Sequence, residues 1–130
     1  MIVHDAIFSR LNTSSVTTLV STRIFPEIAP QDQVLPYVVF RVVDTQPRQI
    51  KDGAAKNNVY TVEAVAFAKT FSSAQSIIDA VSTRLDYWTG AQSGITIRQC
   101  RVDSKNNLPF VAEQEVFGTA LLARVFTYES

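Results

Sequence analysis

The sequence predicts an α+β fold, a four-stranded antiparallel sheet with helices packed mainly on one face. One amphipathic helix lies in the middle of the chain, and segments rich in β-branched and aromatic residues lie on both sides of it. These segments form two pairs of consecutive strands, which favours antiparallel pairing. The expected order is α-α-β-β-α-β-β, in a single domain covering residues 1–130.

The central helix is predicted over residues 72–90, because its apolar residues follow the i, i+3, i+4, i+7 spacing of one helix face. These residues are Ala74, Ile77, Ile78, Val81, Leu85 and Trp88. Ser72 is expected to cap its N-terminus with Gln75 as capping-box partner, and Gly90 to end it.

The segment before the strands is expected to hold two more helices. An apolar stripe predicts a helix over residues 2–12, and Ser14 or Ser15 can cap a second, short helix over 16–22. Prolines then punctuate residues 26–36, which predicts an extended tether over the surface.

The strands are predicted over residues 37–44, 58–67, 95–103 and 115–128, the last with a bend at Gly118. The strands are apolar on both faces, so the face without helices needs a cover, either the proline-rich tether or another copy of the chain. Residues 45–57 join the first two strands by a loop longer than most hairpin connections, and such loops are usually functional or disordered.

Composition excludes several classes of protein. Twelve basic and twelve acidic residues give no net charge, which argues against nucleic acid as the main ligand. The single cysteine allows no internal disulfide, and no signal peptide or membrane-length apolar run is found. The charged fraction of 18% is low for a monomer, which indicates that partners cover some of the surface.

The residues that could carry chemistry form no catalytic, metal-binding or cofactor-binding pattern. His4 is the only histidine and is expected on a helix surface, while Cys100 is expected to be buried. Four strand arginines could form a basic RNA-binding face, but ion-paired contacts between subunits explain them better. These are Arg41, Arg98, Arg101 and Arg124.

Several segments together resemble the tail terminator or tail completion proteins of long-tailed bacteriophages. The segments are Arg-Ile-Phe-Pro at 23–26, Leu-Pro-Tyr-Val-Val-Phe at 35–40, Tyr-Thr-Val-Glu-Ala-Val-Ala-Phe at 60–67, the helix that ends at Leu85, and the last strand opened by Gly118. The resemblance covers essentially the whole chain. Phe25 and Phe67 stand where such proteins often have Tyr and Trp, and both keep the apolar role.

The resemblance implies a non-enzymatic structural protein of the virion, which caps the tail tube, ends its polymerisation and forms the interface for joining tail to head. Its implied partners are further copies in a ring, typically a hexamer, the tail tube protein and a head connector or head completion protein. It implies no membrane and no sequence-specific nucleic acid, although DNA can pass through the ring lumen. The implied location is the head-proximal end of the tail, after assembly in the host cytoplasm.

The contact residues are expected on the long loop and on the first strand. The loop is expected to be mobile in the free subunit and ordered on assembly; the alternative is a surface loop without a function. The expected contact residues are Arg48, Ile50, Lys51 and Lys56 from the loop, and Tyr37, Val39 and Arg41 from the strand. A different class of function stays open, a small α+β enzyme or ligand-binding domain with a pocket between sheet and helix. A stable ring would favour the first interpretation, and a bound small molecule the second.

Overall fold

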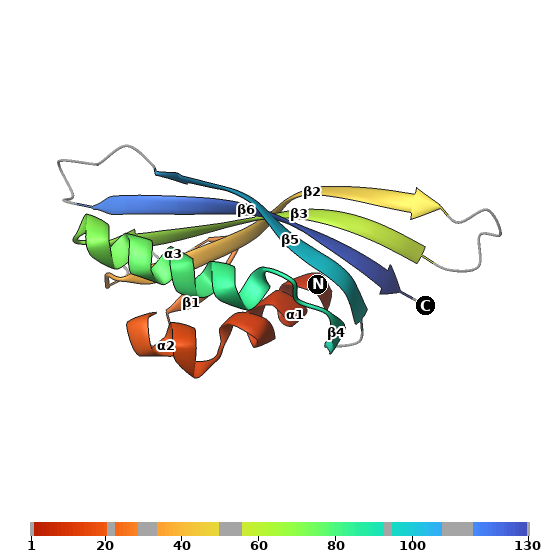
Figure 1. Ribbon diagram of the computed structural model, residues 1–130, viewed down its shortest axis with the longest axis horizontal. Coiled ribbons are helices and arrows are strands. Elements are labelled where there is room, and N and C mark those ends of the chain that lie inside the picture. The colour runs from red at the N-terminus through yellow and green to blue at the C-terminus, as the bar shows by residue number, and fades with distance from the viewer. Residues whose placement is uncertain are drawn as a thin grey trace.

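The computed structural model of the chain has two layers, a curled sheet above and three helices below (Figure 1). It describes residues 2–20, 23–28, 34–49, 56–92, 95–107 and 116–129. The helices are α1 (Ile2–Leu11), α2 (Ser14–Val20) and α3 (Phe71–Leu85). The strands are β1 (Ile24–Pro26), β2 (Tyr37–Gln49), β3 (Lys56–Ala68), β4 (Gly90–Gln92), β5 (Ile95–Asn107) and β6 (Phe117–Glu129).

The sheet has the strand order β1-β2-β3-β6-β5-β4. The four long strands pair antiparallel with one another, as the sequence predicts. The prediction of four strands, all antiparallel, is nevertheless wrong. The short strands β1 and β4 extend the sheet at its two edges, and β1 runs parallel to β2. A strand of three residues is too short to show a period of two, so neither was visible in the pattern.

The core lies between the helices and the sheet face above them, here called the inner face. The apolar stripe of α3 is buried as predicted, at Ala74, Ile77, Ile78, Val81 and Leu85. From α1 and α2 come Val3, Ala6, Ile7, Leu11, Val16 and Val20, and from the long strands Val38, Phe40, Val62, Cys100, Leu121 and Val125, among others. These residues form one continuous apolar cluster.

The ends of α3 differ from the sequence prediction. Thr70, not Ser72, is the N-cap, and its hydroxyl accepts a hydrogen bond from the backbone N–H of Ser73 at 3.1 Å. Gln75 makes no capping box but donates from its side chain to Asn107 of β5. The helix ends at Leu85, and Gly90 (φ +123°) begins β4 instead of ending α3.

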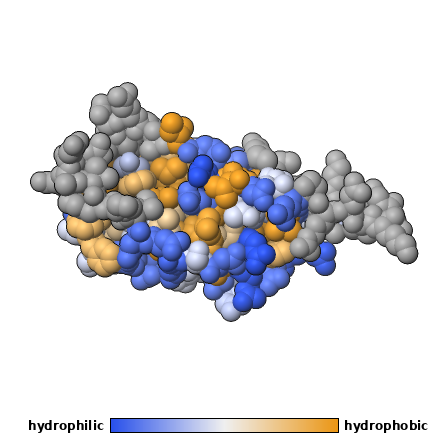
Figure 2. Space-filling view, turned by 90° about the horizontal axis from the view of Figure 1, so that it is seen from above, coloured by the Kyte–Doolittle hydropathy of each residue, from blue (hydrophilic) through white to orange (hydrophobic). Residues whose placement is uncertain are grey.

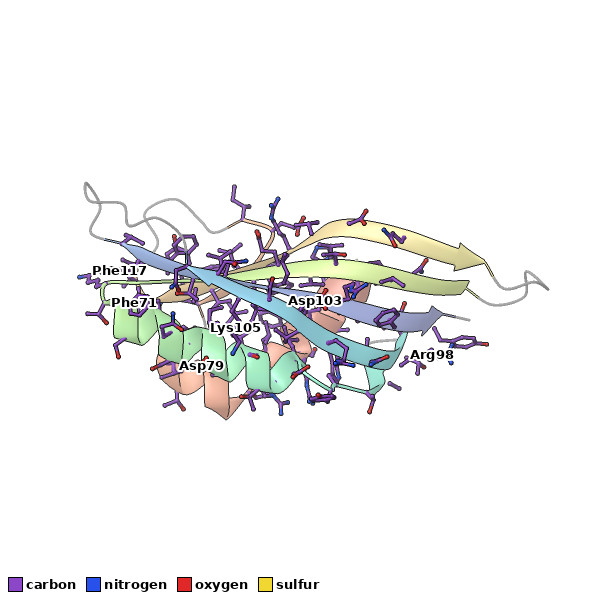
Figure 3. All side chains as sticks on the ribbon, turned by 45° about the horizontal axis from the view of Figure 1, so that its top comes forward. Phe71, Asp79, Arg98, Asp103, Lys105 and Phe117 are labelled. Atoms are coloured by element: carbon purple, nitrogen blue, oxygen red, sulfur yellow. The ribbon has the colours of Figure 1, made fainter. Side chains whose placement is uncertain are left out.

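Side chains fasten the helices to each other and to the sheet. Arg10 and Arg84 each donate from Nε to the other's backbone carbonyl, at 2.7 and 3.2 Å, which satisfies acceptors at the C-terminal ends of α1 and α3. At the side of the sheet, Lys105 of β5 pairs with Asp79 of α3 at 3.3 Å (Figure 3).

Three of the four long strands, β2, β3 and β5, are longer than predicted, and β2 and β5 each carry shifts in their pairing. Because β2 continues to Gln49 and β3 starts at Lys56, most of the predicted loop 45–57 is paired strand; residues 50–55 lie outside the described ranges. The pairing shifts by one residue between Val42 and Asp44 in β2, and twice in β5. In contrast, β3 and β6 pair without a shift past Gly118, so the chain has no bulge there.

The remaining segments agree with the prediction in part. The predicted tether 26–36 begins inside β1 at Pro26, and its end is held where Arg23 donates to the carbonyl of Pro36 at 2.8 Å. The second predicted helix is present from residue 14, and its predicted last two residues lie outside the description. In the described part of the chain, every helix is too short or too polar to cross a membrane.

Candidate functional site

The candidate site is the sheet face opposite the helices, here called the outer face. It carries Tyr37, Val39 and Arg41 of β2, Glu63, Val65 and Phe67 of β3, and Ala120, Leu122, Arg124 and Phe126 of β6, as burial and register place them. Seen from above the sheet, apolar and polar side chains alternate over this face (Figure 2). No described helix covers it (Figure 1).

Three aromatic side chains cross the outer face near β1. Phe25 meets Tyr37 edge to face with ring centres 6.1 Å apart, and Tyr37 meets Phe67 at 5.2 Å. All three are half-buried, and burial raises the pKa of the Tyr37 hydroxyl. We call Phe25, Tyr37 and Phe67 the aromatic strip. Rigid aromatic groups of this kind, left partly open, are typical anchors of protein interfaces.

Beside the aromatic strip lies a shallow hollow with an ion pair at its floor. Arg41 and Glu63 are direct cross-strand neighbours, and Arg41 Nε lies 3.1 Å from Glu63 Oε1. Val39 and Val65 line the hollow with Tyr37 and Phe67, and Ile28 stands 80% exposed at its rim. An exposed isoleucine beside half-buried aromatic groups gives the surface apolar area that a partner can cover.

The opposite part of the outer face, over β5 and β6, is rich in arginine. Arg101 and Arg124 face one another across the two strands, an arrangement that repels unless anions are close. Asp103 pairs with Arg124 at 2.8 Å, while the guanidinium of Arg101 lies over the ring of Tyr87, 5.5 Å from its centre. Tyr87 is 71% exposed and has φ +61°, held by its N–H donating to the carbonyl of Cys100.

The structure brings together three of the seven contact residues expected from the sequence. Tyr37, Val39 and Arg41 line the same hollow. The backbone of Arg48 lies in β2 opposite Asn57, and that of Lys56 lies in β3 opposite Gln49. The side chains of Arg48 and Lys56, and all of Ile50 and Lys51, fall outside the described part. The partners Phe25, Glu63 and Phe67 were not identified as contact residues, because their closeness to Tyr37 and Arg41 depends on strand register.

His4 is less exposed than the sequence suggested. Its side chain is 15% exposed on the inner side of α1, and its ring lies 6.3 Å from that of Phe40. Its Nε2 is 3.1 Å from Glu27 Oε2, near enough for an ion pair with a protonated ring, but the ring nitrogens make no hydrogen bond with a described residue. Cys100 is buried as predicted, and burial, with Asp86 and Asp103 nearby, raises its thiol pKa to about 12. It therefore stays protonated and unreactive near neutral pH.

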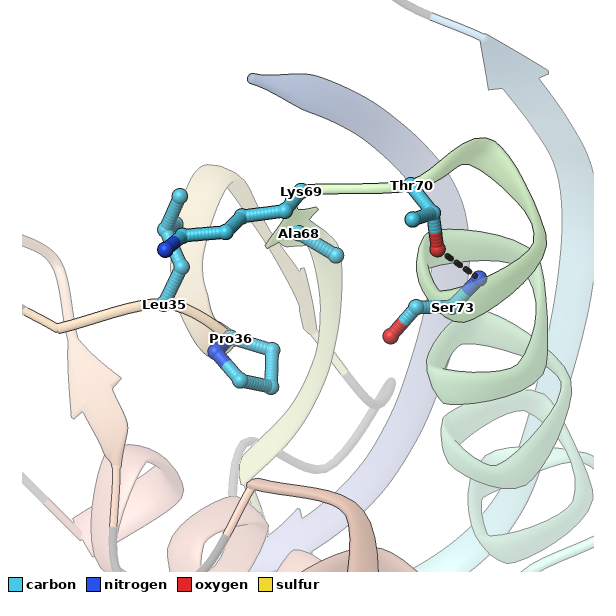
Figure 4. A pocket seen from close by; sticks show the side chains of 6 residues that line it. All are labelled: Leu35, Pro36, Ala68, Lys69, Thr70 and Ser73. Atoms are coloured by element: carbon cyan, nitrogen blue, oxygen red, sulfur yellow. Dashed lines mark hydrogen bonds between the residues drawn. The ribbon is translucent and has the colours of Figure 1, made fainter. Parts of the chain in front are cut away.

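A second hollow lies between the sheet and the start of α3, where a ligand-binding domain would have its pocket. Leu35, Pro36 and Ala68 form its wall, and the Lys69 side chain extends across it (Figure 4). The Thr70 hydroxyl there already caps the helix through Ser73. Among the described residues, His, Cys, Asp and Glu side chains nowhere gather in threes that could hold a metal ion.

Comparisons with known proteins agree with this shape. The chain matches a chain in the solved "Virion of native gene transfer agent (GTA) particle" with a TM-score of 0.82 and 16% sequence identity, over 98% of this chain and 95% of that one. At such an identity the likeness shows a shared fold. A search of curated proteins gives no significant match. The family model of "Tail completion protein gp17" matches residues 5–116, most of the chain. The protein therefore belongs to the tail completion protein gp17 family and is a structural protein of the virion tail.

Proposed function

We propose that this protein forms a ring on the last layer of the tail tube, stops the tube from growing, and presents the surface to which the head is joined. The family membership supports a role in completing the tail. The observation that carries the proposal is the outer face, on which the aromatic strip and the Arg41–Glu63 pair lie away from the helices. A chain with one covered and one uncovered sheet face is suited to assembly.

The physical argument is one of incomplete burial. The inner face is closed by α1, α2 and α3, whereas Tyr37, Val39 and Phe67 are only half-buried. Removing apolar area from water contributes about 25 cal/mol per Å², so a partner that covers this strip gains stability from groups that are already held in place. The Arg41–Glu63 pair next to it is half-solvated and serves register more than affinity.

The contact set we propose includes both parts of the β2–β3 hairpin. Tyr37, Val39 and Arg41 contribute the apolar and charged surface near the base. At the far end, Arg48, Ile50, Lys51 and Lys56 contact a neighbouring copy or the adjoining ring, with Ile50 as the apolar anchor. The ring is a hexamer at the head-proximal end of the tail, its partners are the tail tube protein and a head connector or head completion protein, and DNA passes through its lumen without being read.

The proposal is tested by removing the protein from a phage that encodes it and measuring tails by electron microscopy. Without it, we expect tails of irregular, excessive length and heads that stay unjoined; tails of normal length that carry heads would refute the proposal. Supplying the protein in trans should restore infectious particles. Val39→Lys, which places a charge on the outer face, should fail to restore them, whereas Ser76→Lys, which adds the same charge to an exposed position of α3, should succeed.

A further inference from the structure

Two edges of the sheet carry opposite charge, and beside the charged groups of each edge two backbone groups are already occupied. At the β1–β2 edge, the N–H of Glu27 donates to the carbonyl of Phe40 at 2.7 Å, and the N–H of Val42 donates to Oε2 of Glu27 at 3.0 Å. At the β5 edge, Asp86 accepts from the N–H of Val102 at 3.2 Å, and the N–H of Tyr87 occupies the Cys100 carbonyl. A partner at these places must therefore be recognised by side chains.

Each edge has one ion pair in which the two charges cancel. The pair is Arg41–Glu63 at the β1–β2 edge and Arg124–Asp103 at the β5 edge. What is left beside the first pair is acidic: Glu27 and Asp44, whose carboxylates have only His4 and the amide of Gln46 as described side-chain neighbours. We call these two residues the acidic edge.

Beside the second ion pair, the charge that is left has the other sign. Arg98 and Arg101 are exposed, and Arg101 rests on the ring of Tyr87 instead of on a carboxylate. Figure 3 shows Arg98 and Asp103 along β5, the last long strand on that side. We call Arg98 and Arg101 the arginine edge. Arg124 is paired with Asp103, and Asp86, bound to the backbone at Val102, offsets one further charge. Among the described residues, Arg98 and Arg101 still leave a local excess of positive charge that an acidic partner would relieve.

We propose that neighbouring copies of this chain meet edge to edge, with the acidic edge of one copy facing the arginine edge of the next. Glu27 binds the backbone at Val42, two residues before Asp44, which separates the acidic groups by about 7 Å of strand or less, because a bulge lies between Val42 and Asp44. Arg98 and Arg101 are three residues apart, about 10 Å of strand or less, because a bulge lies between them. The two spacings are similar, so the two acidic groups of one copy can each meet one of the two arginines of the next.

The contact joins two different surfaces, since the acidic edge lies at β1 and β2 and the arginine edge at β5, on opposite sides of the sheet. Such a head-to-tail contact repeats from copy to copy and closes as a ring when the rotation between copies allows it. This inference rests on the proposed function, because it names the surfaces by which the proposed ring is built.

The first test is directed cross-linking in free protein and in purified tails. Asp44→Cys and Arg101→Cys are prepared as separate variants and treated with a short bifunctional maleimide; native Cys100 is buried and does not react. The mixture should give cross-linked dimers, neither variant alone should do so, and a chain carrying both should give a ladder that ends at a fixed number of copies. Ser76→Cys on the exposed side of α3 is the control and should give no product with either. Absence of a mixed product in both preparations overturns the proposal.

The second test exchanges the charges. Asp44→Arg and Arg101→Asp should each lower the yield of joined particles, by about tenfold or more, because like charges then meet at every contact. The two variants supplied together should restore assembly, since alternating copies recreate opposite charges at every contact in a ring with an even number of members. Equal defects without rescue overturn the contact.

A different partner for the arginine edge would also show itself. If Arg98→Asp abolishes co-sedimentation with DNA, and the cross-linking of Asp44→Cys to Arg101→Cys is unchanged when Arg98→Asp is added to both chains, the edge binds phosphate groups and the proposal is wrong. Failure of the proposed function is distinct, because it appears in the deletion phage as normal tails, whatever the cross-linking shows.

Discussion

Replacing Ile78 by alanine tests the packing on which the fold depends. Ile78 is fully buried in the middle of α3, between the helix and the inner face. The change removes three carbon atoms, worth about 0.8 kcal/mol each in transfer from water. A cavity term adds to this, and the better helix propensity of alanine offsets a few tenths of a kcal/mol, so the net loss should be about 2–4 kcal/mol.

The measurement is urea denaturation followed by circular dichroism at low protein concentration, where assembly contributes least. Ile28→Ala is the matched control: it is the same chemical change at a side chain that is 80% exposed, and it should cost less than about 0.5 kcal/mol. A loss below about 1 kcal/mol for Ile78→Ala, or one equal to that of the control, would refute the register of α3 on the sheet.

Three further predictions follow from local structure. Thr70→Ala should lower the free energy of unfolding by about 1 kcal/mol, measured in the same assay, whereas Thr70→Ser, which keeps the cap to Ser73, should cost little. Between about pH 9 and about pH 12, Cys100 loses its proton in the unfolded chain but keeps it in the folded protein, so the free energy of unfolding should fall with rising pH. Cys100→Ala should reduce that fall by up to about 1.4 kcal/mol per pH unit. An unchanged dependence of stability on pH would contradict the burial of Cys100. Replacing residues 50–55 by a tight turn should leave the melting temperature nearly unchanged but give overlong or headless tails, and normal particles would move the contact to the outer face alone.

The parts of the fold that depend on burial could be predicted from the sequence. Ile77, Ile78 and Leu85 follow a period of 3.6, and Val38 and Phe40 a period of two, because each set faces the same core. The extensions of β2 and β5 could not, since the polar residues there are held by hydrogen bonds between backbones, which leave no side-chain pattern. The start of α3 was misplaced for a related reason. Thr70 and Ser72 are both good caps, and only the backbone conformation of the folded chain decides which of them caps the helix.

The candidate site was predicted on one strand only. Tyr37, Val39 and Arg41 were identified because they alternate with buried residues of β2. Their partners Phe25 and Phe67 come from two other strands, and nothing in a single sequence fixes which residues lie opposite one another. The position of Glu27 depends on a left-handed backbone (φ +67°) outside any regular element, which no propensity would assign to glutamate.

The bulge in β2 has a consequence for how this protein can vary between phages. Before it, Tyr37, Val39 and Arg41 alternate outward; after it, pairing puts Asp44 and Gln46 on that face, so odd positions give way to even ones. Inner positions are constrained by the shared fold, whereas outer positions must change together with whatever partner each phage supplies. Along β2, slowly and rapidly diverging positions should alternate, and the alternation should change phase at Val43. One inserted residue thus decides which positions of β2 diverge with the partner: the odd positions before the bulge and the even positions after it.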